Sequence, residues 1–153
     1  MARDLVHGTC VAFGQSAALL RGGSGTGKSD LALRFLALPG EGAGRPLLVA
    51  DDQVWVEPHA NGELIASAPE AIAGRIEVRG VGLMDVPFLA EARLTLVCDL
   101  VHSEEVPRMP PEMWEKTAIA GVAVPVLKLA PFEPSAPLKL KMALLSAAPH
   151  WAC

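Results

Sequence analysis

The sequence predicts an α/β domain with a mixed β-sheet that is richer in antiparallel strand pairs than the usual sheet of this class. Many short apolar or alternating segments are separated by tight turns, which is typical of strands joined as hairpins. Only residues 29–38 and 138–147 have clear helical spacing. A glycine-rich loop at residues 22–29 lies between an apolar run and the first helical stretch. These features predict a sheet organised around a strand–loop–helix unit.

The length and composition predict a single globular domain over residues 1–153. With 51% hydrophobic and 20% charged residues, the chain can bury a substantial core. The net charge of -4 and the absence of a lysine or arginine run weigh against nucleic acid as a partner. The sequence has no secretion-signal pattern and no apolar run long enough to cross a bilayer. The scattered cysteines Cys10, Cys98 and Cys153 fit a reducing compartment, so we expect a cytoplasmic protein.

Four strands are predicted in the first 60 residues. Residues 5–13 and 16–21 are joined by a two-residue turn, so they should pair in antiparallel fashion. Residues 47–50 are apolar throughout, which favours a central strand buried on both faces. Residues 54–57 precede a proline and are predicted to form an edge strand, because proline cannot donate to a ladder. Further strands are predicted at 64–66, 76–79, 94–100 and 122–129, with a polar excursion at 104–116.

Residues 22–29 read Gly-x-x-x-x-Gly-Lys-Ser, the full phosphate-binding loop pattern. Its glycines let backbone N–H groups turn inward and form a nest for phosphate oxygens at a helix N-terminus. Lys28 would reach the β- and γ-phosphates, and Ser29 would place its hydroxyl on Mg²⁺. A turn that ends in Lys-Ser by chance is disfavoured, because the helix start is in register. The expected nucleotide-binding residues are Gly22, Gly23, Ser24, Gly25, Thr26, Gly27, Lys28 and Ser29.

Carboxylates for a magnesium–nucleotide site are expected at the end of a buried strand. Asp51 and Asp52 occupy that position, where an acidic side chain can hold the metal or act as a base on an attacking hydroxyl. Glu77 and Arg79 lie on one side of their strand and could add a metal contact and a phosphate clamp. The alternatives are a solvated Asp-Asp turn and an exposed cross-strand ion pair. His7, alone in an apolar strand, is by pattern more typical of a packed residue than of a catalyst.

Several segments together resemble the catalytic domain of the bacterial HPr kinase/phosphorylase family. They are residues 6–8, 22–30, 48–54, 68–69 and, most specifically, 74–86. Their order and approximate spacing hold over just over half of the chain. Since the family's usual N-terminal domain has no counterpart before them, the chain is similar to a shortened, alphaproteobacterial-type member.

The resemblance implies a P-loop kinase fold that is similar to PEP carboxykinase around the loop. It implies an ATP-dependent protein serine kinase that uses ATP and Mg²⁺, phosphorylates the phosphocarrier protein HPr and regulates the phosphotransferase system. Full-length family members form hexamers, so a homo-oligomer is expected. By motif, Asp51 resembles the aspartate that accepts the serine proton, and His7 and Lys28 resemble other active-site residues. Ser29 and Glu77 resemble the magnesium ligands with Arg79 beside them, and Asp52 completes the expected metal set.

The sequence departs from the family pattern in two places. Asp30 follows the loop serine where the family has glutamate. Residues 127–134 contain no arginine, although the family carries an active-site arginine in a Pro-Gly-Arg-Asn element there. This second departure weighs against phosphorylase activity and favours an alternative, a nucleotide-sensing module that binds ATP and a partner without phosphate transfer. A small-molecule kinase is a third reading, disfavoured because no arginine-rich lid segment is evident.

Overall fold

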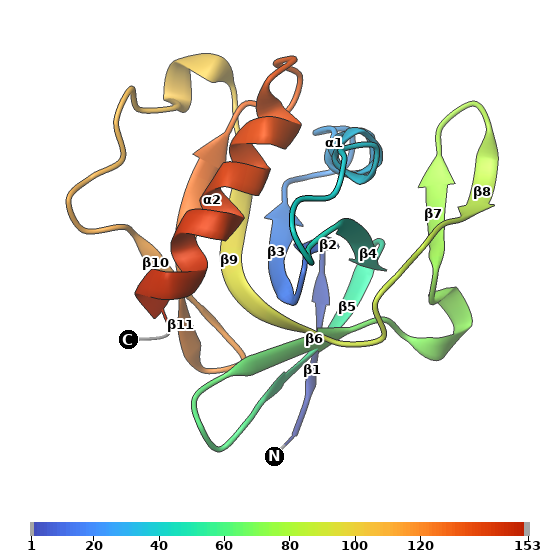
Figure 1. Cartoon of the computed structure of the whole chain (residues 1–153), viewed down its shortest axis with the longest axis horizontal. Coiled ribbons are helices and arrows are strands. Elements are labelled where there is room, and N and C mark those ends of the chain that lie inside the picture. Colours follow the sequence, from blue (N-terminus) through green and yellow to red (C-terminus); the bar gives the residue numbers. More distant parts are fainter. Residues whose placement is uncertain (1, 152–153) are drawn as a thin grey trace.

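The computed structural model describes residues 2–151, with side chains described through residue 146. A nine-stranded mixed sheet carries both helices on one face, and a two-stranded hairpin lies to one side (Figure 1). The main sheet contains β1 (Asp4–His7), β2 (Thr9–Phe13), β3 (Ser16–Arg21), β4 (Pro46–Ala50), β5 (Gln53–Pro58), β6 (Leu64–Ser67), β9 (Ala92–Leu100), β10 (Lys116–Ile119) and β11 (Val122–Leu129). The hairpin is β7 (Arg75–Val78) and β8 (Gly82–Asp85), and the helices are α1 (Lys28–Leu36) and α2 (Ala136–Trp151).

The strand order confirms the predicted mixed sheet. It runs β1-β5-β6-β9-β3-β2-β4, with β11 also pairing with β9, and with β10 pairing with β11. Strands β2 and β3 form the predicted antiparallel hairpin, with Phe13 opposite Ser16. Parallel pairs join β3 to β9 and β9 to β11. Because parallel strands end at the same edge of a sheet, the segments that follow β3, β9 and β11 meet there.

The prediction of one strand over residues 5–13 is wrong, because the chain breaks at Gly8. The N–H of Gly8 donates to the carbonyl of Asp52 at 3.0 Å. A Cβ at Gly8 would lie 2.8 Å from the backbone oxygen of Leu20, so only glycine fits this close approach. The break lets β1 pair with β5 while β2 pairs with β3 and β4.

Two strand positions also differ from prediction. Strand β4 is buried as expected but lies at the end of the sheet rather than in its centre. Its outer edge is covered by the chain near Pro87, which accepts from the N–H of Leu48, while the N–H of Leu89 donates to the carbonyl of Leu48. Strand β5 is not an edge strand, because β1 and β6 pair with its two sides. Long-range partners therefore decided both positions.

Hydrophobic residues pack on both faces of the sheet. Val11 and Phe13 belong to the cluster under α1 and α2, whereas Cys10 and Ala12 belong to a second cluster that includes residues of β5, β6 and β11. This alternation is the two-residue period of a strand. Burial raises the pKa of the Cys10 and Cys98 thiols, which are free and stay protonated in the folded state. Among residues 2–151, no helix has the length and apolar character needed to cross a membrane.

Both helices follow the predicted spacing with shifted ends. Helix α1 begins at Lys28, directly after the glycine-rich loop, and buries Leu31 and Phe35 against the sheet. Helix α2 begins at Ala136, two residues before the predicted start. Pro125 does not interrupt β11, because it is the last residue paired with β10 and the ladder with β9 begins at Val126.

Candidate nucleotide-binding site

The glycine-rich loop connects β3 to α1 and has the backbone shape of an anion nest. Gly25 and Gly27 have φ angles of 80° and 94°, in the left-handed region that favours glycine. The N–H and hydroxyl of Thr26 both donate to the carbonyl of Gly23, at 3.2 and 2.7 Å. The first intrahelical bond of α1 runs from the N–H of Leu31 to the carbonyl of Gly27 at 2.9 Å. The free N–H groups at this helix start are available to an anion.

Lys28 lies across the loop that precedes it. Its Nζ donates to the carbonyl oxygens of Gly22 and Gly23 at 2.6 and 3.1 Å. These are acceptors that phosphate oxygens could replace, because an ammonium carries three donors. The structure thus places the Lys28 ammonium at the loop, and its role as a cation beside bound phosphates stays a prediction.

Asp51 joins three elements at the end of β4. Its side chain is buried, with the residue only 9% exposed. Oδ1 accepts from the Thr9 hydroxyl at 3.0 Å and from the Ser29 hydroxyl at 3.3 Å, and Oδ2 accepts from the Glu77 N–H at 3.1 Å. The structure thus excludes a fully solvated turn at Asp51 and brings Asp51, Ser29 and the backbone of Glu77 together.

Asp52 and His7 form a second, solvent-facing pair. Asp52 has a φ of 71°, and its carboxylate lies 3.5 Å from Nδ1 of His7. Both side chains are mostly exposed, at 71% and 64%. The backbone bond from Gly8 to Asp52 holds the two chain segments side by side. His7 is therefore not the packed residue that its apolar strand favoured, and Ser29 contacts Asp51 rather than Asp52.

Glu77 and Arg79 are carried by the separate β7–β8 hairpin. The Glu77 backbone is held by Asp51, while the side chains of Glu77 and Arg79 face solvent. Glu77 lies opposite Leu83 in the hairpin. The cross-strand ion pair of the hairpin instead joins Arg75 to Asp85, at 3.5 Å. The Glu77 carboxylate is therefore not part of this ion pair. It faces solvent, while its backbone N–H contacts Asp51.

The oxygen groups around Ser29 fit a Mg²⁺ ion bound together with phosphates. No group of three or more histidine, cysteine, aspartate or glutamate side chains forms a metal site within the described residues. Mg²⁺ commonly takes one or two protein oxygens and completes its shell with water and substrate phosphates. The Ser29 hydroxyl and Asp51 carboxylate, 3.3 Å apart, suit that arrangement.

Two arginines that the sequence analysis did not select hold the surroundings of the loop. Arg21, the residue before the loop, binds Asp99 of β9 through two bonds of 2.8 and 3.0 Å. Arg34 of α1 binds Asp30 at 3.0 Å and the carbonyl oxygens of Pro131 and Glu133. Asp30 and Arg34 are four residues apart on a helix, a spacing that signals an ion pair, but the long-range partners had no local signal. Thr9 was missed for the same reason.

The mixed sheet and the phosphate loop together define a protein with a P-loop kinase fold. The structure is similar to that of the Hpr(Ser) kinase/phosphatase from Coxiella burnetii, with a TM-score of 0.79 and 22% sequence identity. The alignment covers 98% of this chain and 99% of that one, which establishes the fold. The family model for the HPr serine kinase C-terminal domain matches residues 1–136, and the chain belongs to this family.

Curated relatives agree with the family assignment. The HPr kinase/phosphorylase of Azoarcus sp. (strain BH72) is 34% identical over 120 residues, which cover 72% of this chain and 36% of that protein. The HPr kinase/phosphorylase of Caldicellulosiruptor bescii is 41% identical over 83 residues, which cover 54% of this chain and 25% of that protein. The chain thus spans about a third or less of the length of these relatives.

Proposed function

We propose that residues 1–153 form one catalytic domain that transfers the γ-phosphoryl group of ATP to a serine of an HPr-like phosphocarrier protein. Through that reaction it would regulate the phosphotransferase system. The observation that carries the proposal is the bond between Ser29 at the start of α1 and the buried carboxylate of Asp51. It joins the phosphate loop to an acidic group that can serve the chemistry at the γ-phosphate.

In this proposal the phosphate loop and Lys28 bind the polyphosphate. The inward N–H groups and the ammonium would offset charge on the oxygens of the transferring group. Ser29, with Glu77 and Asp52 as further candidates, would hold Mg²⁺, which supplies additional charge neutralisation when bound. Arg79, exposed two residues beyond Glu77, could reach the phosphates or the acceptor.

Asp51 is the proposed base for the acceptor serine. A serine hydroxyl is a poor nucleophile, so a carboxylate must take its proton as the new P–O bond forms and the bond to ADP breaks. A carboxylate has about four lone-pair sites. Three of those on Asp51 are engaged by Thr9, Ser29 and Glu77, which leaves one on Oδ2 for the acceptor. The exposed His7–Asp52 pair lies on the adjoining segments, where it could orient the acceptor chain.

A nucleotide-sensing module without transfer activity is the second candidate. Residues 127–134, where the family motif carries an active-site arginine, contain none in this chain. A protein of this kind would bind ATP, Mg²⁺ and a partner and would label no serine.

We also propose that the protein works in the cytoplasm as a homo-oligomer. The free, buried Cys10 and Cys98 thiols are consistent with a reducing compartment. Leu138, Met142 and Leu145 form an exposed apolar stripe along α2, a feature that favours self-association. Sedimentation equilibrium of the purified chain would test the oligomeric state.

Labelled ATP distinguishes the two candidate functions. The purified chain would be incubated with labelled ATP, Mg²⁺ and HPr from the same organism. The kinase proposal expects label on an HPr serine, none with Lys28→Ala, and none with Asp51→Asn despite retained ATP binding. Glu91→Gln, an exposed carboxylate, is the matched control. ATP binding without any labelled serine would favour the sensing module, and normal transfer by Asp51→Asn would refute the proposed base.

A further inference from the structure

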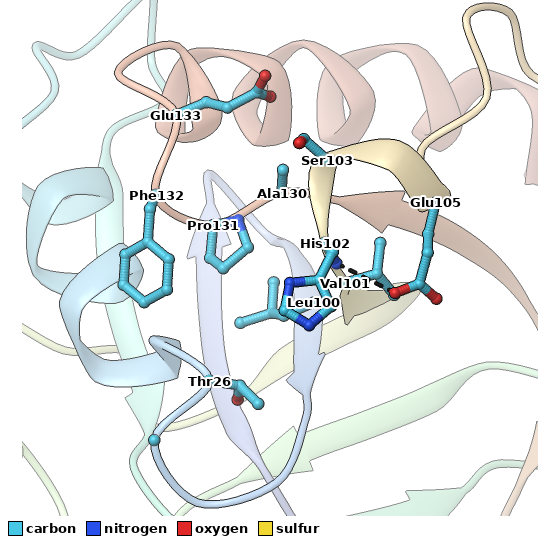
Figure 2. A pocket seen from close by; sticks show the side chains of 11 residues that line it. Thr26, Leu100, Val101, His102, Ser103, Glu105, Ala130, Pro131, Phe132 and Glu133 are labelled. Atoms are coloured by element: carbon cyan, nitrogen blue, oxygen red, sulfur yellow. Dashed lines mark hydrogen bonds between the residues drawn. The ribbon is translucent and has the colours of Figure 1, made fainter.

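A pocket of about 620 Å³ opens directly from the phosphate loop. Gly25 and Thr26 form one wall, residues from 100–105 at the end of β9 and just beyond it form a second, and residues 130–133 after β11 form a third. These are the segments that the parallel pairs β3–β9 and β9–β11 bring to one edge of the sheet. Figure 2 shows Thr26 of the loop below Pro131, with Phe132 and His102 to either side of that proline. A ligand whose phosphates occupy the loop could therefore extend into this pocket.

Phe132 is an aromatic side chain that is both fixed and exposed. It is 68% exposed, yet a Cβ added at Gly27 would lie 2.9 Å from its Cζ, so the ring rests on the backbone at the start of α1. Arg34 binds the carbonyl oxygens on both sides of Phe132, those of Pro131 and Glu133. A large apolar ring held toward solvent in a concave site is typical of a surface that a ligand covers.

The remaining groups that line the pocket disfavour an anionic ligand group and favour a flat, mostly apolar group. No lysine or arginine lines the pocket in the described part of the chain, whereas Glu105 and Glu133 do. The Glu133 carboxylate is paired with Lys139 at 3.0 Å, and Oε1 of Glu105 accepts from the N–H of His102 at 3.4 Å. Carboxylate, hydroxyl and imidazole groups on an apolar pocket can bond the polar edge of a heterocycle.

We propose that this pocket binds the nucleobase of the nucleotide, with the base stacked on Phe132 and its polar edge toward residues 102–105. The proposal rests on nucleotide binding as described under Proposed function and adds the residues that recognise the base. Inorganic polyphosphate lacks a base, so it should bind the loop without engaging Phe132. This difference separates the pocket from the loop experimentally.

Isothermal titration with Mg·ATP and with Mg·tripolyphosphate, using the full chain, tests the pocket. Loss of base stacking costs about 1–3 kcal/mol, so Phe132→Ala should weaken ATP binding about 5- to 150-fold. Tripolyphosphate affinity should stay within about two-fold, and Phe132→Trp should keep ATP binding. Met113→Ala, which truncates a side chain of 86% exposure outside the pocket lining, is the control for loss of an exposed apolar group. Thermal unfolding of each variant checks that the fold is intact.

The outcomes separate the pocket from the proposed function. Unchanged ATP affinity in Phe132→Ala, or equal losses for ATP and tripolyphosphate, would overturn the pocket while leaving the kinase proposal in place. Selective loss of ATP affinity in a chain that labels no HPr serine would support the pocket and refute the kinase. A wild-type chain that binds neither ligand would overturn both.

Discussion

The hydroxyl of Ser29 lies 3.3 Å from Oδ1 of Asp51, although the two residues belong to different elements. Ser29 is in the first turn of α1, and Asp51 follows β4. Strand β2 lies between β3 and β4, so the bond spans a full strand of the sheet. Thr9 of β2 shares the same carboxylate oxygen and lies between the two partners in the sheet. The site is thus assembled across three neighbouring strands rather than within one loop.

Ser29→Ala should reduce the benefit that Mg²⁺ gives to ATP binding. The hydroxyl is a proposed ligand for the ion, and its removal should weaken Mg²⁺-supported binding at least about ten-fold. Binding measured with a chelator present should change little. Ser146→Ala, which removes the hydroxyl of an exposed serine on α2 outside the loop, is the control. Equal losses with and without Mg²⁺ would contradict a metal role for Ser29.

Thr9→Val should destabilise the fold. Valine preserves the shape but removes a donor to the buried Asp51, and losing a bond to a buried charged group costs about 1–3 kcal/mol. Urea unfolding followed by circular dichroism would measure the change. Thr95→Val is matched to it, because the Thr95 hydroxyl is only half-buried and makes a 3.5 Å contact, so a change within about 0.5 kcal/mol is expected. Equal effects of the two substitutions would refute a special contribution from Thr9.

Arg34→Lys should loosen the segment after β11. The Arg34 guanidinium donates to the Asp30 carboxylate and to two backbone carbonyl oxygens at the same time. The ammonium group of a lysine cannot reproduce that planar geometry. A loss of about 1–2 kcal/mol is expected, which lowers the melting temperature by about 2–8 °C in a domain of this size. Scanning calorimetry would measure it, with the exposed Arg93→Lys as control. An unchanged melting temperature would show that the three contacts contribute nothing to stability.

The buried thiols should resist alkylation in the folded protein. Burial raises the pKa of Cys10 and Cys98, so the reactive thiolate is scarce even in alkaline buffer. In a Cys153→Ser background, iodoacetamide should label neither thiol until urea unfolds the chain, when both should react. Unfolded thiols ionise near pH 8.5, so stability should fall as pH rises above that value, since only the unfolded state loses these protons. Rapid labelling of the native protein at pH 9 would be inconsistent with this burial.

Local sequence signals predicted the parts of the site that local geometry determines. The pattern ending in Lys28-Ser29 predicted the loop and the helix start, and the apolar run before Asp51 predicted a buried strand with an acidic end. The family resemblance identified Glu77, whose backbone does bind Asp51. The functional roles assigned to these residues, and those of His7, Asp52 and Arg79, stay predictions.

Features set by distant partners could not be read from the sequence. The apolar character of residues 47–50 signals burial, but the segment near Pro87 rather than another strand covers one edge of β4. Similarly, Pro58 suggested that residues 54–57 form an edge strand. The prediction was wrong because nothing local indicates that β1, which ends before Gly8, pairs with β5. The pocket beside the loop includes segments that lie 75 or more residues after Gly25 in the sequence, so no local motif predicts it.

The hairpin of β7 and β8 is a sheet of its own in the described chain. Only one strand residue of that hairpin, Ile76, is fully buried, and a hydrogen bond from the Glu77 N–H to the Asp51 carboxylate joins the hairpin to the end of β4. Rearranging this hairpin would therefore disturb one amide contact and the packing of Ile76 and Val78 against the core, with the hydrogen bonds of the larger sheet preserved. The hairpin could therefore change its position to fit the proposed acceptor protein without disturbing the anion nest.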